Sequence, residues 1–387
     1  MPMHLKPIEE QVVVITGASS GIGLVTARMA AQRGAHVVLA ARDRDALAQI
    51  AEEIRRDGGI AVHCVADVAD EAEMRRVADT AVRSFGGIDT WVNNAGVSIY
   101  GRIEEVSMED HRRLFETNYW GVVIGSRIAV EHLRPQGGAL INVGSVVSER
   151  AIPLQGAYSA SKHAVKAFTD ALRMELEADG APISVTLIKP ASIDTGFEEH
   201  ARNYMNQEPT VPQPVYAPEL VANAILHAAQ HPVRDLFVGG GGKGFQWGER
   251  YAPRMTDYMM ERMLFSGQQA GPRLRERDSL HEPWNNGHAS SGRHGFVRHT
   301  SLYTSAELHP WTTAALFAGL GALAVAAYSG RLPGMGDGQS RTRRMHDARR
   351  RERAAGMATA NTEGMELGHN AKPAGEAAHE SHVTFPR

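Results

Sequence analysis

The stretch VVVITGASSGIG, residues 12–23, decides the fold of this chain. Its first five residues, Val12–Thr16, are all β-branched, which predicts a strand buried in a parallel sheet. A glycine-rich turn follows, and an apolar helical segment, Leu24–Arg33, ends before Gly34. In such a turn, glycines let the backbone approach a pyrophosphate, and the helix N-terminus adds unpaired N–H groups and partial positive charge. The stretch therefore predicts a dinucleotide-phosphate site, although a plain strand-to-helix turn would share its G-x-x-x-G-x-G pattern.

Strands and helices alternate from this stretch to residue 238. Short β-branched or apolar runs predict further strands at 36–40, 61–66, 90–92, 139–143, 183–189 and 235–238. The segments between them predict helices at 45–56, 71–85, 106–132, around Tyr158 and at 218–230. Regular alternation of this kind implies an α/β fold with a doubly wound parallel sheet, Rossmann-like and contained in a single domain.

The composition of the 387 residues is that of a soluble enzyme, with 43% hydrophobic and 22% charged residues. A formal net charge of -3 gives no reason to expect specific nucleic-acid binding. Cys64 is the only cysteine, which excludes an intrachain disulfide and is compatible with a reducing compartment. The 18 histidines lack the spacing of metal ligands, so no metal site is expected. Because the N-terminus has no apolar signal-peptide core, we expect a cytoplasmic catalytic domain.

Tyr158 and Lys162 lie four residues apart in the helix-compatible run AYSASKHAV, residues 157–165. At this spacing their side chains share one helix face. A free tyrosine has a pKa of about 10, and a neighbouring cation lowers that pKa because it favours the phenolate. The pair therefore predicts a tyrosine that can give or take a proton near neutral pH. By itself, the same motif also fits two residues that share an exposed helix face by chance.

Two strand ends carry residues suited to a nucleotide ligand. The 36–40 strand continues into Ala41 and Arg42, without the acidic residue that usually binds the ribose 2′-hydroxyl of NAD. Arg42 can pair with a 2′-phosphate, which favours NADP, although an exposed arginine before a helix fits as well. The small residues of NNAG, at 93–96, follow the 90–92 strand and let a flat ring lie close to the backbone.

Several motifs in a fixed order resemble those of the short-chain dehydrogenases/reductases. They are TGASSGIG at 16–23, Asp67, NNAG at 93–96, Asn118, Ser145, YSASK at 158–162 and the loop from Pro190 to Thr195. The glycine spacing resembles the short rather than the extended branch of the family. One departure is Ala191, where the family often carries glycine, and we expect it to change the stiffness of the loop more than its chemistry.

The resemblance implies an oxidoreductase that transfers hydride between NADP(H) and a carbonyl or secondary alcohol, with NAD(H) as the alternative cofactor. Tyr158 would protonate the developing alkoxide, and Lys162 would lower the Tyr158 pKa and hold the nicotinamide ribose. Ser145 would donate a hydrogen bond to the substrate oxygen, and Asn118 would position a water that links Lys162 to solvent. The implied cofactor-contacting residues are Gly17, Ser19, Ser20, Gly21, Ile22, Gly23, Arg42, Asp67, Val68, Asn94, Ala95, Gly96, Tyr158, Lys162, Pro190, Ile193 and Thr195.

The substrate class follows from the loops at 146–158 and 197–251, whose apolar content indicates a lipophilic ketone or secondary alcohol. We also expect a homo-oligomer. The alternative is a non-catalytic dinucleotide-binding sensor or membrane scaffold. The complete set of Asn118, Ser145, Tyr158 and Lys162 argues against it, because a sensor does not need a proton relay.

Beyond residue 238 the composition changes several times. The GGGGKG run at 239–244 indicates a boundary or a flexible loop. The Met-rich segment 245–265 predicts one or two helices that close over the substrate mouth or pack in the core or a dimer. We assign residues 1–267 to the catalytic domain, 268–310 to a polar linker, 311–328 to a hydrophobic helix and 329–387 to a disordered tail.

Residues 311–328 form an uncharged apolar stretch with an aromatic residue at each end, the pattern of a short transmembrane or interfacial helix. An arginine-rich segment follows at 341–353. A simple span would place these arginines outside, against the positive-inside tendency. An interfacial helix, or one packed on the enzyme, avoids the conflict. The sequence thus predicts membrane association through residues 311–328, with a domain-packed helix as the alternative.

Overall fold

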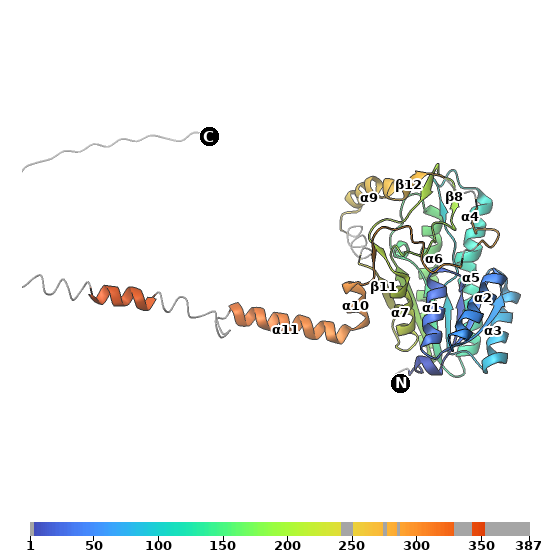
Figure 1. Cartoon of the computed structure of the whole chain (residues 1–387), viewed down its shortest axis with the longest axis horizontal. Helices are drawn as coiled ribbons and strands as arrows, with labels where there is room; N and C mark the ends of the chain where they lie inside the picture. The colour runs from blue at the N-terminus through green and yellow to red at the C-terminus, as the bar shows by residue number, and fades with distance from the viewer. Residues whose placement is uncertain (1–3, 241–250, 274–276, 285–286, 329–342, 353–387) are drawn as a thin grey trace, which may run out of the picture. The chain divides into compact units, whose positions relative to one another are not determined.

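The computed structural model describes residues 4–240, 251–273, 277–284, 287–328 and 343–352. Its centre is a sheet of seven parallel strands in the order β11-β7-β6-β4-β1-β2-β3 (Figure 1). These strands are β1 (Val12–Thr16), β2 (His36–Ala41), β3 (Ile60–Val65), β4 (Thr90–Asn93), β6 (Gly138–Val143), β7 (Ile183–Pro190) and β11 (Asp235–Val238). The chain winds outward in both directions from β1 and β4, so a crevice opens between them at the carboxyl ends of the strands.

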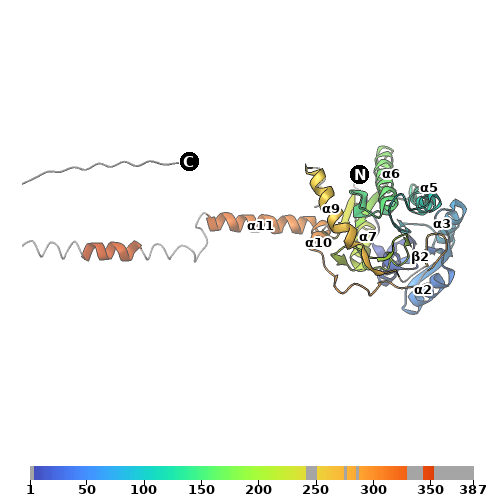
Figure 2. The same ribbon diagram turned by 90° about the horizontal axis from the view of Figure 1, so that it is seen from above.

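Helices cover both faces of this sheet. The helices are α1 (Gly21–Gln32), α2 (Arg44–Arg56), α3 (Glu71–Phe85), α4 (Met108–Phe115), α5 (Gly121–Leu133), α6 (Gly156–Ala178) and α7 (Pro218–Ala228). One apolar core joins α1, α2 and α7 to one face, and a second joins α3, α5 and α6 to the other. Figure 2 shows α5 and α6 on the side opposite α2. The predicted doubly wound α/β fold is confirmed.

Short polar residues set the starts of two helices beside the crevice. The Asp43 carboxylate accepts the Ala46 N–H at 3.0 Å and begins α2. The Asp70 carboxylate accepts the Glu73 N–H at 2.9 Å and begins α3. Such N-caps stabilise a helix by about 1 kcal/mol each. They also hold the two loops that carry Arg42 and Asp67.

The helix predicted at 106–132 is interrupted in the structure. It consists of α4, a π-helical turn η2 (Glu116–Trp120) and α5. A π-turn adds a residue to one helical turn and is frequent at functional sites. Asn118 lies in this turn and is fully buried. The apolar periodicity alone did not predict the break, because α4 and α5 each keep a helical pattern.

The segment 268–310 differs from the polar linker expected from its composition. Its strands β12 (Gln269–Pro272) and β13 (Val297–Arg298) pair with β9 (Gln207–Pro209) and β10 (Val215–Tyr216). It also contains α10 (Leu302–Leu308) and follows α9 (Pro253–Gly267). The remaining short elements are η1 (Ile8–Glu10), η3 (Val146–Ser148) and the pair β5 (Ile99–Tyr100) and β8 (Arg202–Asn203). Hydrogen bonds between residues far apart in the sequence attach this segment to the rest of the domain, for example from the Ser279 N–H to the His200 carbonyl at 2.9 Å. Composition alone could not predict them.

The chain divides into two compact units, residues 1–312 and 313–387. The helix α11 (Pro310–Tyr328) matches the predicted hydrophobic helix within one residue. Among the described residues, no single helix is long and apolar enough to cross a membrane; only the bent pair Leu302–Leu308 and Thr312–Ala326 meets that test by length and composition. The GGGGKG run lies mostly outside the described residues.

Part of the predicted disordered tail is helical. Residues 343–352, the only described residues beyond α11, form a short exposed helix. Their sequence is RRMHDARRRE, which is rich in residues with high helix propensity. Asp347 and Arg351 also lie four residues apart, the spacing of a favourable ion pair on a helix. The prediction of disorder is therefore corrected for these ten residues; the rest of the tail lies outside the described part.

Candidate active site

A cavity of about 840 Å³ lies at the carboxyl edge of the sheet, where a doubly wound fold binds its ligands. Its walls come from the turns that follow β1, β2, β4, β6 and β7. All the residues predicted to contact a cofactor line it except Gly23, and so does Ser145. Asn118 and Gly23 lie behind the wall. The turns thus bring together residues from positions 17 to 195, as the motif order predicts.

The glycine turn after β1 is shaped by two close backbone approaches. Gly17 has a φ of +64°, and a Cβ there would lie 2.8 Å from the Ala95 Cα. A Cβ on Gly23 would lie 2.2 Å from the Gly17 carbonyl oxygen. Any other residue at position 23 would push the turn away from the N-terminus of α1. Gly23 therefore acts by shaping the phosphate cradle rather than by lining it.

Asn94 holds two of the turns together. Its side-chain amide donates to the carbonyl oxygens of Thr16 at 3.0 Å and Gly17 at 3.2 Å. The Thr16 hydroxyl oxygen in turn accepts the N–H groups of Asn94 and Ala95 at 3.0 and 3.2 Å. This reciprocal network fixes the spacing between the glycine turn and the NNAG loop, where a flat ring could lie.

Ser145 and Tyr158 meet at the centre of the cavity. Ser145 ends the turn after β6, where its hydroxyl accepts the Val147 N–H at 3.2 Å and caps η3. The hydroxyl also lies within hydrogen-bonding distance, 3.5 Å, of the Pro190 carbonyl oxygen. Tyr158 enters from the first turn of α6 and makes a hydrogen bond with Ser145. Its ring packs on Phe197, with 5.6 Å between the ring centres.

Lys162 lies one helical turn beyond Tyr158 and is buried. Its Nζ donates to the Val143 carbonyl at 2.9 Å and lies 5.7 Å from the centre of the Tyr158 ring. Gly96 separates Lys162 from Asn118: a Cβ placed on Gly96 would contact both side chains, at 3.7 and 3.5 Å. The Asn118 side chain accepts the Val97 N–H at 2.8 Å and donates to the Val97 carbonyl oxygen at 2.9 Å. This pairing, made possible by the π-turn, fixes the orientation of Asn118.

Burial controls the titration of both helix residues. It raises the pKa of Tyr158 to about 12, against the opposite effect of the hydrogen bond with Ser145. It lowers the pKa of Lys162 to about 8. The Tyr158 pKa thus lies above its usual value in this structure, the direction opposite to the one expected beside Lys162. Burial disfavours the phenolate, and the hydrogen bond with Ser145 offsets only part of that effect.

At the end of the cavity beside β2 and β3, Asp67 forms an ion pair that the sequence did not reveal. Its carboxylate accepts a hydrogen bond from Arg113 at 2.5 Å. Burial raises the pKa of Asp67, but the hydrogen bonds from the Ala69 N–H and Arg113 outweigh it and keep that pKa below its usual value. Arg42 lies at the same end, and its guanidinium donates to the carbonyls of residues 279–281. Arg113 belongs to no recognisable motif, and only the fold brings it to Asp67.

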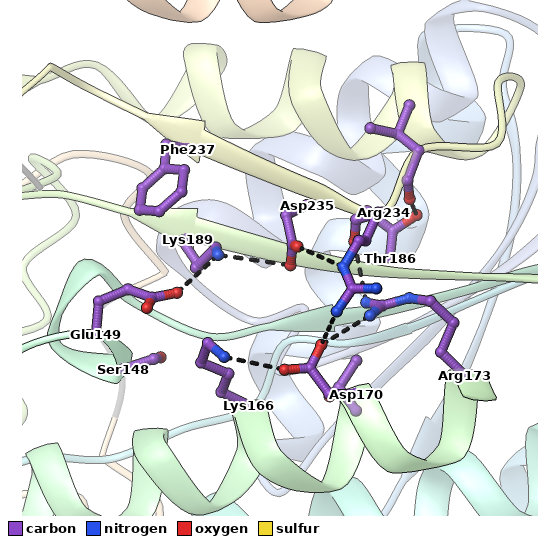
Figure 3. Close-up of polar contacts among 12 residues, drawn as sticks. Ser148, Glu149, Lys166, Asp170, Arg173, Thr186, Lys189, Arg234, Asp235 and Phe237 are labelled. Atoms are coloured by element: carbon purple, nitrogen blue, oxygen red, sulfur yellow. Dashed lines mark hydrogen bonds and ion pairs between the residues drawn. The ribbon is translucent and has the colours of Figure 1, made fainter. Parts of the chain in front are cut away.

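A buried ion pair supports the Ser145 loop (Figure 3). Lys189, in the strand position before Pro190, lies 2.8 Å from Glu149, the residue that ends η3. Asp235 of the edge strand β11 lies 3.5 Å from the same Lys189 Nζ. The pair thus joins the loop that begins with Ser145 to the strand that leads into the Pro190 loop.

The opposite end of the cavity is mainly apolar. Six of its lining residues are Val146, Val147, Ile152, Phe197, Met260 and Met263, the last two from α9. Polar groups enter this part of the wall from Arg150, Gln155 and His200. A cavity of this size and character, with a few placed polar groups, is typical of a small-molecule site.

Comparison with known proteins gives the family. Residues 11–206 match the family model for the short chain dehydrogenases. The uncharacterised oxidoreductase YxnA of Bacillus subtilis (strain 168) is 45% identical over 329 residues, which cover 84% of this chain and 92% of that protein. The 11-beta-hydroxysteroid dehydrogenase A of Sesamum indicum is 32% identical over 268 residues, 66% of this chain and 76% of that protein.

Two solved structures share the fold. An alcohol dehydrogenase from Thermococcus sibiricus, complexed with 5-hydroxy-NADP, has a TM-score of 0.53 and 28% identity and covers 59% of this chain and 95% of its own. A short-chain dehydrogenase/reductase from Burkholderia phymatum, complexed with NAD, has a TM-score of 0.55 and 26% identity and covers 68% and 98%. Sheet order, the glycine turn and these matches agree. The chain belongs to the short-chain dehydrogenase/reductase family of oxidoreductases and has the fold that binds a nicotinamide dinucleotide.

Proposed function

We propose that this protein is an NADP-dependent carbonyl reductase or alcohol dehydrogenase for a lipophilic carbonyl or secondary alcohol. The nicotinamide, when bound, would supply or accept the hydride. Tyr158 would give its proton to the developing alkoxide, while Ser145 donates a hydrogen bond to the same oxygen. Lys162 would hold the nicotinamide ribose and keep a positive charge beside Tyr158. Asn118, behind Gly96, would position a water next to Lys162.

The observation that carries this proposal is the meeting of Ser145, Tyr158 and Lys162 in one cavity. They come from two different elements, the turn after β6 and the helix α6. Lys162 is only 4% exposed, and a buried ammonium group costs stability unless it is paired and hydrogen-bonded. A sensor that only binds a dinucleotide has no need of a proton relay formed by Ser145, Tyr158 and Lys162 together. Proton transfer during carbonyl reduction explains both the lysine and its position.

The preference for NADP(H) is supported by the end of the cavity beside β2. Position 41 is alanine, and the Asp43 carboxylate caps α2 instead of facing a ribose. Arg42 lines the cavity, where its guanidinium would donate to a 2′-phosphate. A charge-assisted hydrogen bond contributes roughly 1.5–3 kcal/mol, or about ten- to a hundredfold in affinity. NAD(H) stays the alternative.

The test is a panel of ketones of increasing apolar size, assayed by NADPH and NADH oxidation with the wild-type protein and Tyr158→Phe. We expect the wild type to reduce the larger apolar ketones. Loss of the phenolic proton should lower turnover by about 10²–10⁴-fold and leave cofactor affinity nearly unchanged. A Tyr158→Phe variant with near-wild-type turnover would show that the assigned proton donor is wrong.

We also infer that the catalytic domain is cytoplasmic and that α11 brings it to a membrane surface. The support is the apolar character of α11 on every side: Leu316, Phe317, Leu320 and Leu323 are each more than half exposed. A helix that is apolar all round has to be buried in protein or lipid. We also propose that the catalytic domain forms a homo-oligomer.

A further inference from the structure

The segment after β12 forms a strap along one wall of the cavity. It comprises residues 277–284 and 287–298 and lies between β12 and α10 (Figure 1). Its composition is polar, yet it is attached to the catalytic domain along its length. The attachments follow the cavity from the Arg42 end, past the glycine turn, to the loop after Pro190.

At the first end, the strap contacts both arginines beside Asp67. Arg42 donates to the carbonyl oxygens of Ser279, of Leu280 at 3.3 Å and of His281 at 3.0 Å. Arg113 also donates to the Leu280 carbonyl, at 3.2 Å. Backbone carbonyls of the strap therefore carry the partial negative charge that faces these two guanidinium groups.

Side chains anchor the same end. Leu280 is fully buried and packs in a cluster with Val97, Leu114 and Ala157, the residue before Tyr158. The ring of His281 lies 2.7 Å from the Asp110 carboxylate, and Asp278 forms an ion pair with Arg202 at 2.8 Å. This end is thus held by apolar burial and charge together.

The middle and far parts of the strap lie against the glycine turn and the loop after β7. The Gly21 N–H, at the start of α1, donates to the His288 carbonyl at 3.1 Å. Ser290 and Ser291 both donate to the Asp194 carboxylate, the residue before Thr195. His294 lies 2.9 Å from Glu198.

The cavity continues beneath the strap. Ser279, Pro283 and Trp284 line it together with Arg42 and Asp67. The strap is therefore an outer wall of the cavity, with space between it and the sheet edge. A ligand lying along that edge would have the strap on its solvent side.

We propose that the strap completes the dinucleotide site and gates it, so that the cofactor enters and leaves only when the strap lifts. This rests on the proposed function, in which the cavity binds a nicotinamide dinucleotide. Opening requires Leu280 to leave its cluster and the hydrogen bonds to Arg42, to the Gly21 N–H and to Asp194 to break. Because one gate controls both directions, loosening it raises the association and release rates together and changes the dissociation constant much less.

The experiment measures these two rates on full-length protein by stopped-flow fluorescence of NADPH, with release followed after mixing with excess NADP. Leu280→Ala loosens one end and the double variant Ser290→Ala with Ser291→Ala loosens the other. Leu302→Ala is the matched control, because Leu302 lies beyond the strap and is 91% exposed. The two loosened variants are at opposite ends, so one remains informative if the other folds poorly.

We expect release and association to be roughly tenfold faster in Leu280→Ala, since the buried side chain favours the closed strap. The serine variant should be a few-fold faster in both, and Leu302→Ala should match the wild type. Unchanged rates in both loosened variants, with normal NADPH binding, would overturn the gate alone. Faster release without faster association would also overturn it and make the strap a plain binding contact. A wild-type protein that binds neither NADPH nor NADH would overturn the proposed function and the gate together.

Discussion

At the scale of single residues, the site contains a charged group, Lys162, whose burial on folding costs free energy. Lys162 is buried with the Val143 carbonyl as a hydrogen-bond acceptor, and burial lowers its pKa to about 8. A group whose pKa falls from the unfolded value of about 10.4 disfavours the fold while it is charged. The penalty is full below about pH 8 and disappears as the pH rises through the unfolded value. Function, rather than stability, explains a lysine at this position.

Replacing Lys162 by methionine should therefore stabilise the protein and inactivate it. Methionine has a similar shape and carries no charge, so the gain at pH 7 can reach roughly 3 kcal/mol. It should decrease steadily between pH 8 and pH 10, because the wild-type lysine then loses its proton on folding. Thermal unfolding of both proteins across this pH range, without added cofactor, measures the difference. A melting temperature that falls at every pH would contradict the assigned cost of burial.

A second residue-scale prediction concerns Ala41. An acid at the end of β2 can accept hydrogen bonds from a ribose 2′-hydroxyl and repels a 2′-phosphate. We expect Ala41→Asp to move the preference from NADPH toward NADH by about ten- to a hundredfold. The ratio of the two dissociation constants, from fluorescence titration, is the measurement. Ala41→Ser serves as the control for size. Tighter binding of NADH than of NADPH by the wild type would sink the assignment of Arg42.

At the scale of elements, the Ser145 loop depends on the buried pair Lys189 and Glu149. The two side chains are 4% and 9% exposed, and the Lys189 ammonium also lies 4.2 Å from the centre of the Phe237 ring. The chain offers a natural contrast on α6. Lys166 forms a similar ion pair with Asp170 at 2.9 Å, but its side chain is 32% exposed. The two ion pairs therefore have nearly the same N···O distance and differ mainly in how deeply they are buried.

Lys189→Met should lower the free energy of unfolding by about 3–5 kcal/mol, because it removes the buried ammonium group that lies 2.8 Å from the Glu149 carboxylate. Lys166→Met should cost less than about 1 kcal/mol, as is usual for exposed pairs. We expect Lys189→Met also to lower kcat more than it changes KM, since the loop positions Ser145 against the substrate oxygen. Denaturant unfolding and steady-state kinetics measure the two effects. Equal losses in the two variants would mean that burial does not distinguish the pairs.

At the scale of the whole molecule, the chain carries a catalytic unit and a second unit that begins in α11. We expect full-length protein to sediment with membranes in cell fractionation, because α11 has no polar face. The double variant Leu320→Glu with Leu323→Glu should move the protein to the soluble fraction and leave turnover unchanged. Leu302→Glu, on α10, is the control. Full-length wild type that stays soluble and monodisperse would refute the membrane assignment.

Local sequence patterns determined most of the sheet. Short β-branched or apolar runs predicted all seven parallel strands within one or two residues, because a buried parallel strand needs apolar side chains on both faces. The glycine turn was equally clear, since Gly17 and Gly23 occupy positions where a Cβ meets backbone. The motif order predicted which residues line the cavity. The strands and the glycine turn are encoded by neighbours in the chain, whereas the lining residues were implied by the family resemblance.

Only the tertiary structure decided the rest. Arg113 and Asp67 are 46 positions apart in the sequence, and the strap and Arg42 are more than 230 apart. Hydrophobic periodicity predicts only local structure, so it could not predict either contact. The polar composition of the strap predicted a linker. Composition does not show that the polar groups of the strap have hydrogen-bond partners far away in the sequence. The direction of the Tyr158 pKa was mispredicted for the same reason. A neighbouring lysine is visible in the sequence, whereas the desolvation that raises the Tyr158 pKa depends on everything packed around the pair.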